Sequence, residues 1–254
     1  EITELALKDE NGNSVDDIGN GWFIGEPTVV FYDFEKIGIY QADEVALAAS
    51  AENKVPGEIK IRDQNGDGVI TDADRIILGT DVPDYYGGIT NTFNYKNWDF
   101  SFFFYFRQGQ LIRSRFHDSN NSLFGRYNNL DVDYWTVDNP TNAFPRPNEN
   151  QESARNASTL SYFDGSYIKL RNMQLGYNFS EKLTDKLKID NLRLYLAGQN
   201  LWFLSDYDTF DPEVSEEDNT TTNADGEVTS RTAGVSSSTV PSNKMFLLGL
   251  NVTF

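Results

Sequence analysis

Residues 83–106 alternate between apolar and polar side chains in two adjoining runs. In the second run every other residue is aromatic: Trp98, Phe100, Phe102, Phe104 and Phe106. The first run repeats the pattern less densely, with Tyr85, Ile89, Phe93 and Tyr95. Side chains alternate between the two faces of a strand, and Lys96 and Asn97 form a short polar joint between the runs. The stretch therefore predicts a β-hairpin with one aromatic face and one mostly polar face.

The same period of two predicts four more strands, at residues 22–34, 166–179, 191–204 and 246–254. In the strand at 166–179, Lys169 and Arg171 occupy alternate positions at which the pattern otherwise places apolar side chains. We therefore expect them either beyond the hydrocarbon of a membrane or past a β-bulge.

One helix is predicted, over residues 43–52. This segment is rich in Ala, carries acidic residues in its first turn and ends before the Pro-Gly pair at 56–57. No internal repeat of fixed period accompanies these elements, which disfavours propellers and solenoids.

Two architectures accommodate an aromatic sheet face. A soluble sandwich buries it against a second sheet, whereas an outer-membrane barrel turns it to lipid and keeps the polar face inside. The connections favour the barrel, because short joints at 96–97 and 180–190 alternate with long segments at 34–83, 108–165 and 205–241. Long segments without clear periodicity are uncommon in compact soluble domains. The pattern therefore predicts an all-β fold, an antiparallel transmembrane β-barrel whose long connections are extracellular loops.

Composition narrows the classes of function. The formal net charge of −18 argues against a nucleic-acid partner, which needs a basic surface. The absence of cysteine excludes disulfides and thiolate metal sites. The sequence contains no apolar run of about eighteen residues, so it predicts no transmembrane helix. The first residues lack the basic and apolar regions of a signal peptide. We therefore expect the chain to begin after processing or partway through a longer protein.

Residues 63–74 fit a twelve-residue calcium loop. The expected oxygen ligands are Asp63, Asn65, Asp67, the backbone carbonyl of Val69, Thr71 and Asp74. Gly68 falls where such a loop must turn sharply, and the last ligand is an Asp where an EF-hand has the longer Glu. Hard oxygen ligands suit Ca²⁺ better than Zn²⁺. The sequence predicts a structural Ca²⁺ that stiffens segment 34–83, and the alternative is an Asp-, Asn- and Gly-rich turn without metal.

Signals for catalysis are weak. His117 is the single histidine, and the G-x-S-x-G sequence of a nucleophile elbow is absent, so we expect a polar loop histidine. With 39 acidic residues, carboxylate pairs arise by chance, and no Gly-rich phosphate loop occurs. The sequence therefore predicts no catalytic residue and no enzyme. Sugar-stacking positions stay open among Tyr105, Phe116, Tyr134 and Trp135. Solvated or acid-paired side chains are expected at Arg107, Arg113, Arg115 and Arg126.

Several segments, in this order, resemble those of the SusC/RagA-like TonB-dependent outer-membrane transporters. They are GEP at 25–27, FYDF at 31–34, GIYQ at 38–41, PGEIK at 56–60, DQNGDG at 63–68, DRIILG at 74–79, YIKLRN at 167–172, LGY at 175–177, GQNL at 198–201, and YD and DPE within 207–213. The terminal Phe254 resembles the signal read by the barrel-insertion machinery. The resemblance runs from about residue 22 to the end of the chain.

The resemblance implies a barrel of about twenty-two strands around an amino-terminal plug, with this chain supplying roughly the last six strands and three extracellular loops. It implies import of glycan oligosaccharides or peptides. The implied partners are the remainder of the barrel and its plug, a SusD-like surface lipoprotein, the TonB complex, the oligosaccharide or peptide substrate, and outer-membrane lipid. The implied location is the outer membrane of a Gram-negative bacterium, with the carboxy-terminus on the periplasmic side.

A different class of protein accounts for the same features. A soluble, secreted, calcium-stabilised β-rich module for carbohydrate binding or adhesion would use the same loop and the same aromatic residues. Solubility separates the two hypotheses, because apolar stripes on every strand require detergent if they face lipid and not if they face a second sheet.

Overall fold

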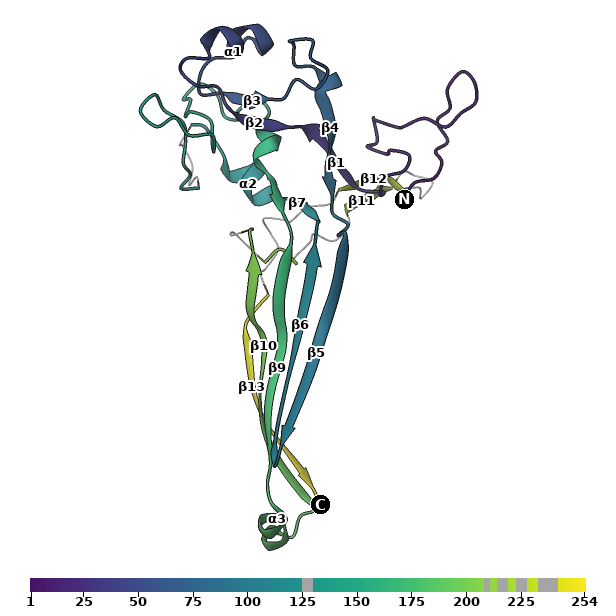
Figure 1. The fold of residues 1–254 in the computed structure, drawn as a ribbon, viewed down its shortest axis with the longest axis vertical. Coiled ribbons are helices and arrows are strands. Elements are labelled where there is room, and N and C mark those ends of the chain that lie inside the picture. The colour runs from purple at the N-terminus through teal and green to yellow at the C-terminus, as the bar shows by residue number, and fades with distance from the viewer. Residues whose placement is uncertain (125–129, 208–210, 214–218, 223–227, 233–241) are drawn as a thin grey trace. The chain divides into compact units, whose positions relative to one another are not determined.

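In a computed structural model of the 254-residue chain, the described residues are 1–124, 130–207, 211–213, 219–222, 228–232 and 242–254 (Figure 1). They form two units. The described residues within 1–82, 111–163 and 215–239 belong to unit 1, and those within 83–110, 164–214 and 240–254 belong to unit 2. In the part of the chain that the structure describes, no helix is long and apolar enough to cross a membrane.

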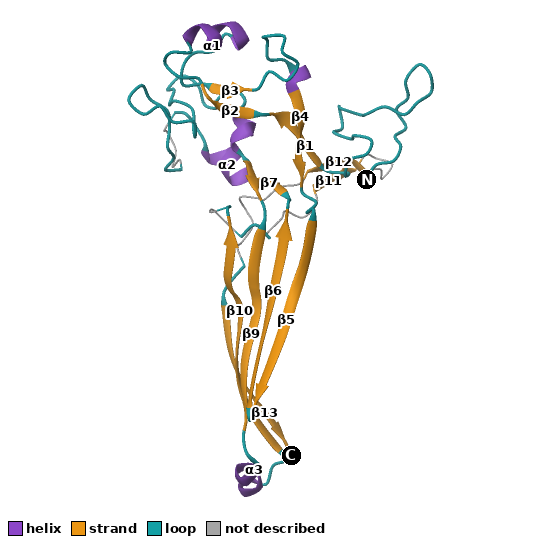
Figure 2. Ribbon diagram, in the orientation of Figure 1, coloured by secondary structure: helices purple, strands orange, loops and turns teal. Residues whose placement is uncertain are grey.

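Unit 2 is an antiparallel sheet of five long strands, in the order β13-β10-β9-β6-β5 (Figures 1 and 2). The strands are β5 (Tyr85–Tyr95), β6 (Trp98–Gln108), β9 (Tyr167–Asn178), β10 (Asn191–Ser205) and β13 (Met245–Thr253). The predicted hairpin is confirmed as β5 and β6, and Lys96 makes its turn with φ 54°. A short helix, α3 (Glu181–Leu187), occupies the predicted turn between β9 and β10.

The two faces of this sheet differ as the alternation predicts. One row across all five strands is apolar: Phe93, Phe100, Leu175, Leu196 and Leu248. The neighbouring row on the opposite face is Thr92, Ser101, Gln174, Ala197 and Leu247. The apolar row is open to its surroundings, with Leu248 71% and Phe93 53% exposed. Such exposure is costly in water, so this face requires a cover.

A bulge in β9 explains the charged residues on its apolar parity. Phe103 pairs with Asn172 and Phe104 with Leu170, so Arg171 is the extra residue. A second irregularity lies at the same level of β10, where Asn200 has φ 51°. Because a one-residue bulge exchanges the faces of the residues beyond it, Lys169 lies opposite Tyr105, on the polar face. The expectation of a bulge is confirmed.

Unit 1 is built from short elements. The strand β1 (Val30–Phe34) pairs with β4 (Arg75–Thr80), and β2 (Lys36–Ile39) pairs with β3 (Ile59–Ile61). The predicted helix is confirmed as α1 (Val45–Glu52). The remaining elements are η1 (Asp72–Asp74), β7 (Leu111–Arg113), α2 (Arg115–Asn120), η2 (Ala157–Leu160), β8 (Tyr162–Asp164), β11 (Asn219–Thr222) and β12 (Val228–Thr232).

The prediction of a long strand at residues 22–34 is wrong. Only Val30–Phe34 is a strand, and it pairs with β4 rather than with the five-stranded sheet. Gly25 has φ 91°, which extended backbone does not adopt, and Pro27 has no N–H for a ladder hydrogen bond. Among the described residues the large sheet therefore has five strands instead of the expected six.

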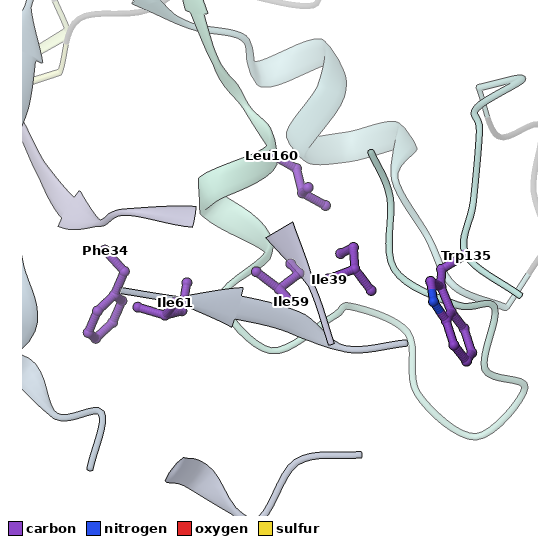
Figure 3. Packing of buried hydrophobic residues seen from close by; sticks show 6 residues of the cluster. All are labelled: Phe34, Ile39, Ile59, Ile61, Trp135 and Leu160. Carbon is purple, nitrogen blue, oxygen red and sulfur yellow. The ribbon is translucent and has the colours of Figure 1, made fainter. Parts of the chain in front are cut away.

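A small hydrophobic core organises unit 1. Its buried members are Phe34, Ile39, Ile59, Ile61, Trp135 and Leu160 (Figure 3). Ile70, Phe144 and Ala154 pack against this cluster. Ile70 belongs to the predicted calcium loop, so the core fixes one side of that loop.

Candidate functional site: the polar face of the five-stranded sheet

The polar face of the sheet is hollowed at its middle. A cavity of about 390 Å³ spans it from β5 to β13. Its lining is uncharged and mixes polar, aromatic and aliphatic residues, including Thr90, Ser101, Phe102, Phe103, Asn172, Met173, Gln174, Tyr195, Gln199 and Leu247. Amide and hydroxyl groups beside aromatic rings bind uncharged polar ligands by hydrogen bonding and stacking. Sequence analysis predicted the polar face and left Tyr105 on it open as a stacking position, but it selected none of the residues that line this cavity.

An ion pair crosses this face towards one end of the sheet. Arg193 donates from Nη2 and Nε to the Asp99 carboxylate, at 2.5 and 3.1 Å, and Asn178 donates to the same carboxylate at 3.3 Å. Gly176 lies between the two charged residues, and a Cβ there would overlap both of them. The absence of a side chain at Gly176 therefore permits a two-pronged pair that fixes both partners.

A buried lysine anchors the start of the last long connection to the sheet. Lys169 is 2% exposed, and its Nζ donates to Asp211 at 2.6 Å, Glu213 at 2.8 Å and the Ser242 hydroxyl at 2.8 Å. Arg171 also pairs with Glu213 and lies 3.8 Å from the centre of the Tyr105 ring. Sequence analysis quoted these residues separately and did not join them, because a cation on a strand does not reveal a partner about forty positions away.

The predicted calcium ligands are only partly brought together. Asp63 accepts the N–H groups of Gly66 and Gly68, at 2.7 and 2.8 Å. Asn65 accepts the N–H of Asp67, and Asp67 accepts the N–H of Val69, both at 2.8 Å. The side-chain oxygens thus shape the turns of the loop. Within the described ranges, no group of three or more Asp, Glu, His or Cys side chains is gathered as a metal site.

Two further predicted ligands form the base of this loop. Thr71 caps η1, and its own N–H donates to Asp74 at 2.8 Å. Asp74 is fully buried and also accepts the N–H of Gln64 at 2.9 Å. The N–H of Thr71, with that of Gln64, holds the pKa of Asp74 below its ordinary value. The calcium assignment itself stays a prediction.

The other candidates take structural positions. His117 is 7% exposed, in α2 rather than in a polar loop, and its Nδ1 lies 2.7 Å from the Ser114 hydroxyl that caps this helix. Trp135 is a core residue whose Nε1 donates to Gln41 at 2.9 Å, so it is no stacking platform. Arg113 pairs with Asp118 at 3.0 Å, as expected for an acid-paired side chain. Arg126 lies outside the described residues.

Sequence comparison identifies the relatives of this chain. A TonB-dependent receptor of Formosa agariphila, P26, is 34% identical over 238 residues, which are 91% of this chain and 23% of the receptor. The TonB-dependent receptor SusC of Bacteroides thetaiotaomicron is 27% identical over 232 residues, 84% of this chain and 20% of SusC. This chain is homologous to part of the SusC/RagA-like TonB-dependent receptors. It spans less than a quarter of the length of these curated relatives. No protein-family profile matches it.

Structural comparison agrees with the family of TonB-dependent receptors. A chain in the structure of the RagAB peptide transporter superposes with a TM-score of 0.65 and 19% identity, over 92% of this chain and 24% of that one. At 19% identity, the superposition shows that the two chains share a fold. The open five-stranded sheet therefore has the fold of a section of a β-barrel wall, which confirms the predicted fold class. These relatives bear the names of receptors and a transporter and not of enzymes.

Proposed function

We propose that this chain forms part of a TonB-dependent importer in the outer membrane of a Gram-negative bacterium. The observation that carries the proposal is the two-faced sheet, with exposed apolar rows on one side and a polar, hollowed surface on the other. Its strands have 9 to 15 residues, enough for the roughly 9–11 residues of a tilted membrane-spanning strand. The apolar face would contact lipid and the polar face would line the passage.

The cargo we propose is an oligosaccharide or a peptide, taken up beneath a SusD-like lipoprotein. SusC and the RagAB peptide transporter support this assignment by their names and by similarity to this chain. The neutral lining of the 390 Å³ cavity suits hydroxyl-rich or amide-rich cargo and offers no cluster of cations for phosphates. Energy would come from TonB through the plug, and the carboxy-terminus would lie on the periplasmic side.

The soluble alternative is disfavoured by the aromatic face. In that reading a second sheet covers Phe93, Phe100 and their neighbours. Among the described residues of unit 2, only the five-stranded sheet is present, and no second sheet packs on its aromatic face. Lipid is the cover we propose for the apolar side chains of this face, of which Phe93 is 53% and Leu248 71% exposed.

Gel migration tests the barrel. The gene product that carries this chain, extracted from outer membranes in mild detergent, is expected to give a compact band that shifts on boiling. Growth on oligosaccharides or on peptides as sole nutrient, with and without TonB, then distinguishes the cargo. A protein that stays in the aqueous fraction and shows no shift would contradict the proposal and support the soluble module.

A further inference from the structure

Lysine side chains gather at one end of the five-stranded sheet, where the turn between β5 and β6 and the helix α3 lie (Figures 1 and 2). They are Lys96, Lys182, Lys186 and Lys188, and all four are exposed. In the described part of the chain, none of their ammonium groups makes an ion pair. This turn end, residues 96–97 and 180–190, carries four lysines against three acidic residues, whereas the whole chain has 21 Lys and Arg against 39 Asp and Glu. The turn end is therefore the place where unpaired positive charge collects in an acidic protein.

Hydrogen bonds hold the turn and α3 at the same end of the sheet. The Asn97 side chain donates to the carbonyl of Asn178 at 2.8 Å, and the N–H of Asn178 donates to the carbonyl of Asn97 at 2.8 Å. Asn178 is the last residue of β9, shortly before α3 begins. After α3, the N–H of Asp190 donates to the carbonyl of Thr253 in β13, also at 2.8 Å. The connection that contains α3 is therefore tied to the sheet at both ends.

The exposed residues of α3 are arranged in rows. Lys182 and Lys186 are four positions apart, so they lie on the same side of the helix. Leu183 and Leu187 form the neighbouring row and are 36% and 54% exposed. Thr184 is the buried residue of this helix. A row of lysines beside a row of exposed leucines is typical of a helix that lies at the surface of a membrane.

Aromatic side chains show where such a surface would lie. Tyr95, Trp98 and Tyr177 are neighbours in one row of the apolar face at the turn end, and Tyr95 is 70% and Trp98 49% exposed. Tyr and Trp collect at membrane interfaces, because each has an apolar ring and one polar group. Lys96 directly follows Tyr95, and its Nζ lies 5.3 Å from the centre of the Tyr95 ring. The lysines are therefore within a few residues of the expected headgroup level.

We propose that Lys96 and the three lysines at α3 bind the phosphate groups of anionic phospholipids in the leaflet at the turn end. The inference rests on the proposed function, which turns the apolar face of the sheet to lipid. Lysine suits this level, because its stem lies along apolar surface while its ammonium group stays among polar groups. Several lysines close to an anionic membrane surface attract it together. The exposed Leu183, Leu187 and aromatic rings favour lipid over an acidic protein as the partner.

Photo-crosslinking from α3 identifies the molecule beside it. The complete protein that carries this chain, with the photoreactive benzoylphenylalanine in place of the exposed Leu187, is reconstituted in phosphatidylethanolamine nanodiscs. These contain equal small amounts of two alkyne-tagged lipids, anionic phosphatidylglycerol and phosphatidylcholine, which has no net charge. Phosphatidylglycerol adducts are expected to exceed phosphatidylcholine adducts at least about fivefold, the ratio that corresponds to the attraction of one lysine to an anionic surface.

Three variants of this protein test the role of the lysines. Lys96→Gln, Lys182→Gln, Lys186→Gln and Lys188→Gln, combined, remove four charges at similar length, so the ratio of adducts is expected to fall to about one. Arg at the same four positions keeps the charge and is expected to keep the preference. The matched control places Gln at four exposed cations outside the turn end: Lys8, Arg62, Arg75 and Lys244. It is expected to keep the preference as well.

Heat-modifiable gel migration first shows whether each protein has formed a barrel. With a barrel present, equal adducts of the two lipids, an unchanged ratio in the glutamine variant, or an equal loss in the matched control would overturn the inference and leave the proposed function standing. Crosslinking to a protein instead of lipid, when Leu187 is replaced in cells and outer membranes are irradiated, would do the same. A protein that forms no barrel would contradict the proposed function itself.

Discussion

Asp74 shows how one carboxylate closes a loop. It is fully buried, yet it accepts the N–H groups of Gln64 and Thr71 and so ties the two ends of segment 63–74 together. Its pKa lies below the ordinary value because those donors favour the charged form. Such a group stabilises the folded loop above the pKa it has when unfolded, about 3.9, and this stabilisation is lost as the pH falls through the lower folded value.

Asp74→Asn is expected to loosen this loop by about 1–3 kcal/mol, because an amide nitrogen faces an N–H donor in place of an acceptor. Hydrogen exchange of the Gln64 and Thr71 amides measures the effect. In the wild type, protection should persist at neutral pH and decline only in acid below the ordinary carboxyl pKa. Acid-induced loosening that the variant shows as strongly as the wild type would contradict this role.

Lys169 is the second residue with a large expected effect. Lys169→Met leaves Asp211 and Glu213 without their shared cation, and breaking a buried pair from one side costs about 3–5 kcal/mol. We expect faster proteolysis near residues 206–213 and a lower melting temperature. Adding Asp211→Asn to Lys169→Met should recover part of the loss. Lys182→Met, at an exposed position in α3, serves as the control.

At the scale of elements, β9 carries the difference between the faces of the sheet. Leu175 lies on its apolar face and Gln174 on its polar face, one position apart. Leu175→Arg is expected to destabilise the barrel by about 2–4 kcal/mol, because it places a charge in lipid, whereas Gln174→Arg is tolerated. The fraction of heat-modifiable protein in outer membranes measures both. Equal losses in the two variants would show that neither face meets lipid.

Element prediction from sequence succeeds where one signal dominates. The hairpin of β5 and β6 follows from the alternation in the two runs of residues 83–106 and from the short polar joint between them. The bulge at Arg171 follows from charged residues at positions where the alternation of β9 predicts apolar ones. The strand predicted at residues 22–34 is absent over 22–29, because Gly25 and Pro27 impose a backbone geometry that does not suit a strand. Among the short elements of unit 1, β2, β3 and η2 escaped prediction because they contribute buried residues to the core around Trp135 and show no clear periodicity of their own.

Binding sites are harder to predict from the sequence than the polar and apolar faces of the sheet. The polar face was predicted from alternation, but its cavity depends on the register of five strands. The Lys169 cluster depends on a bulge and on a segment about forty residues away. The calcium loop was recognisable because all six expected ligands lie within twelve consecutive residues, and its metal content is a question for experiment.

At the scale of the whole molecule, calcium is the predicted stabiliser of segment 34–83. Millimolar Ca²⁺ is expected to raise the melting temperature of the intact protein and its resistance to proteolysis near Asp63, since a ligand that binds only the folded state stabilises it. Asp63→Ala should remove the effect, and Asp138→Ala, at an exposed position outside the loop, should retain it. An equal response of wild type and Asp63→Ala to chelator would show that the loop is a metal-free turn.

The glycines of the polar face have a consequence for the width of the passage that we propose this face lines. Tyr195 occupies the space that a Cβ of Gly249 would need, and Phe103 does the same at Gly88, as Asp99 and Arg193 do at Gly176. Large side chains therefore lie flat against the neighbouring strand at its glycine, instead of standing away from the sheet. We therefore expect that one methyl group added at such a glycine would displace the ring beside it and narrow the proposed passage without altering its chemistry.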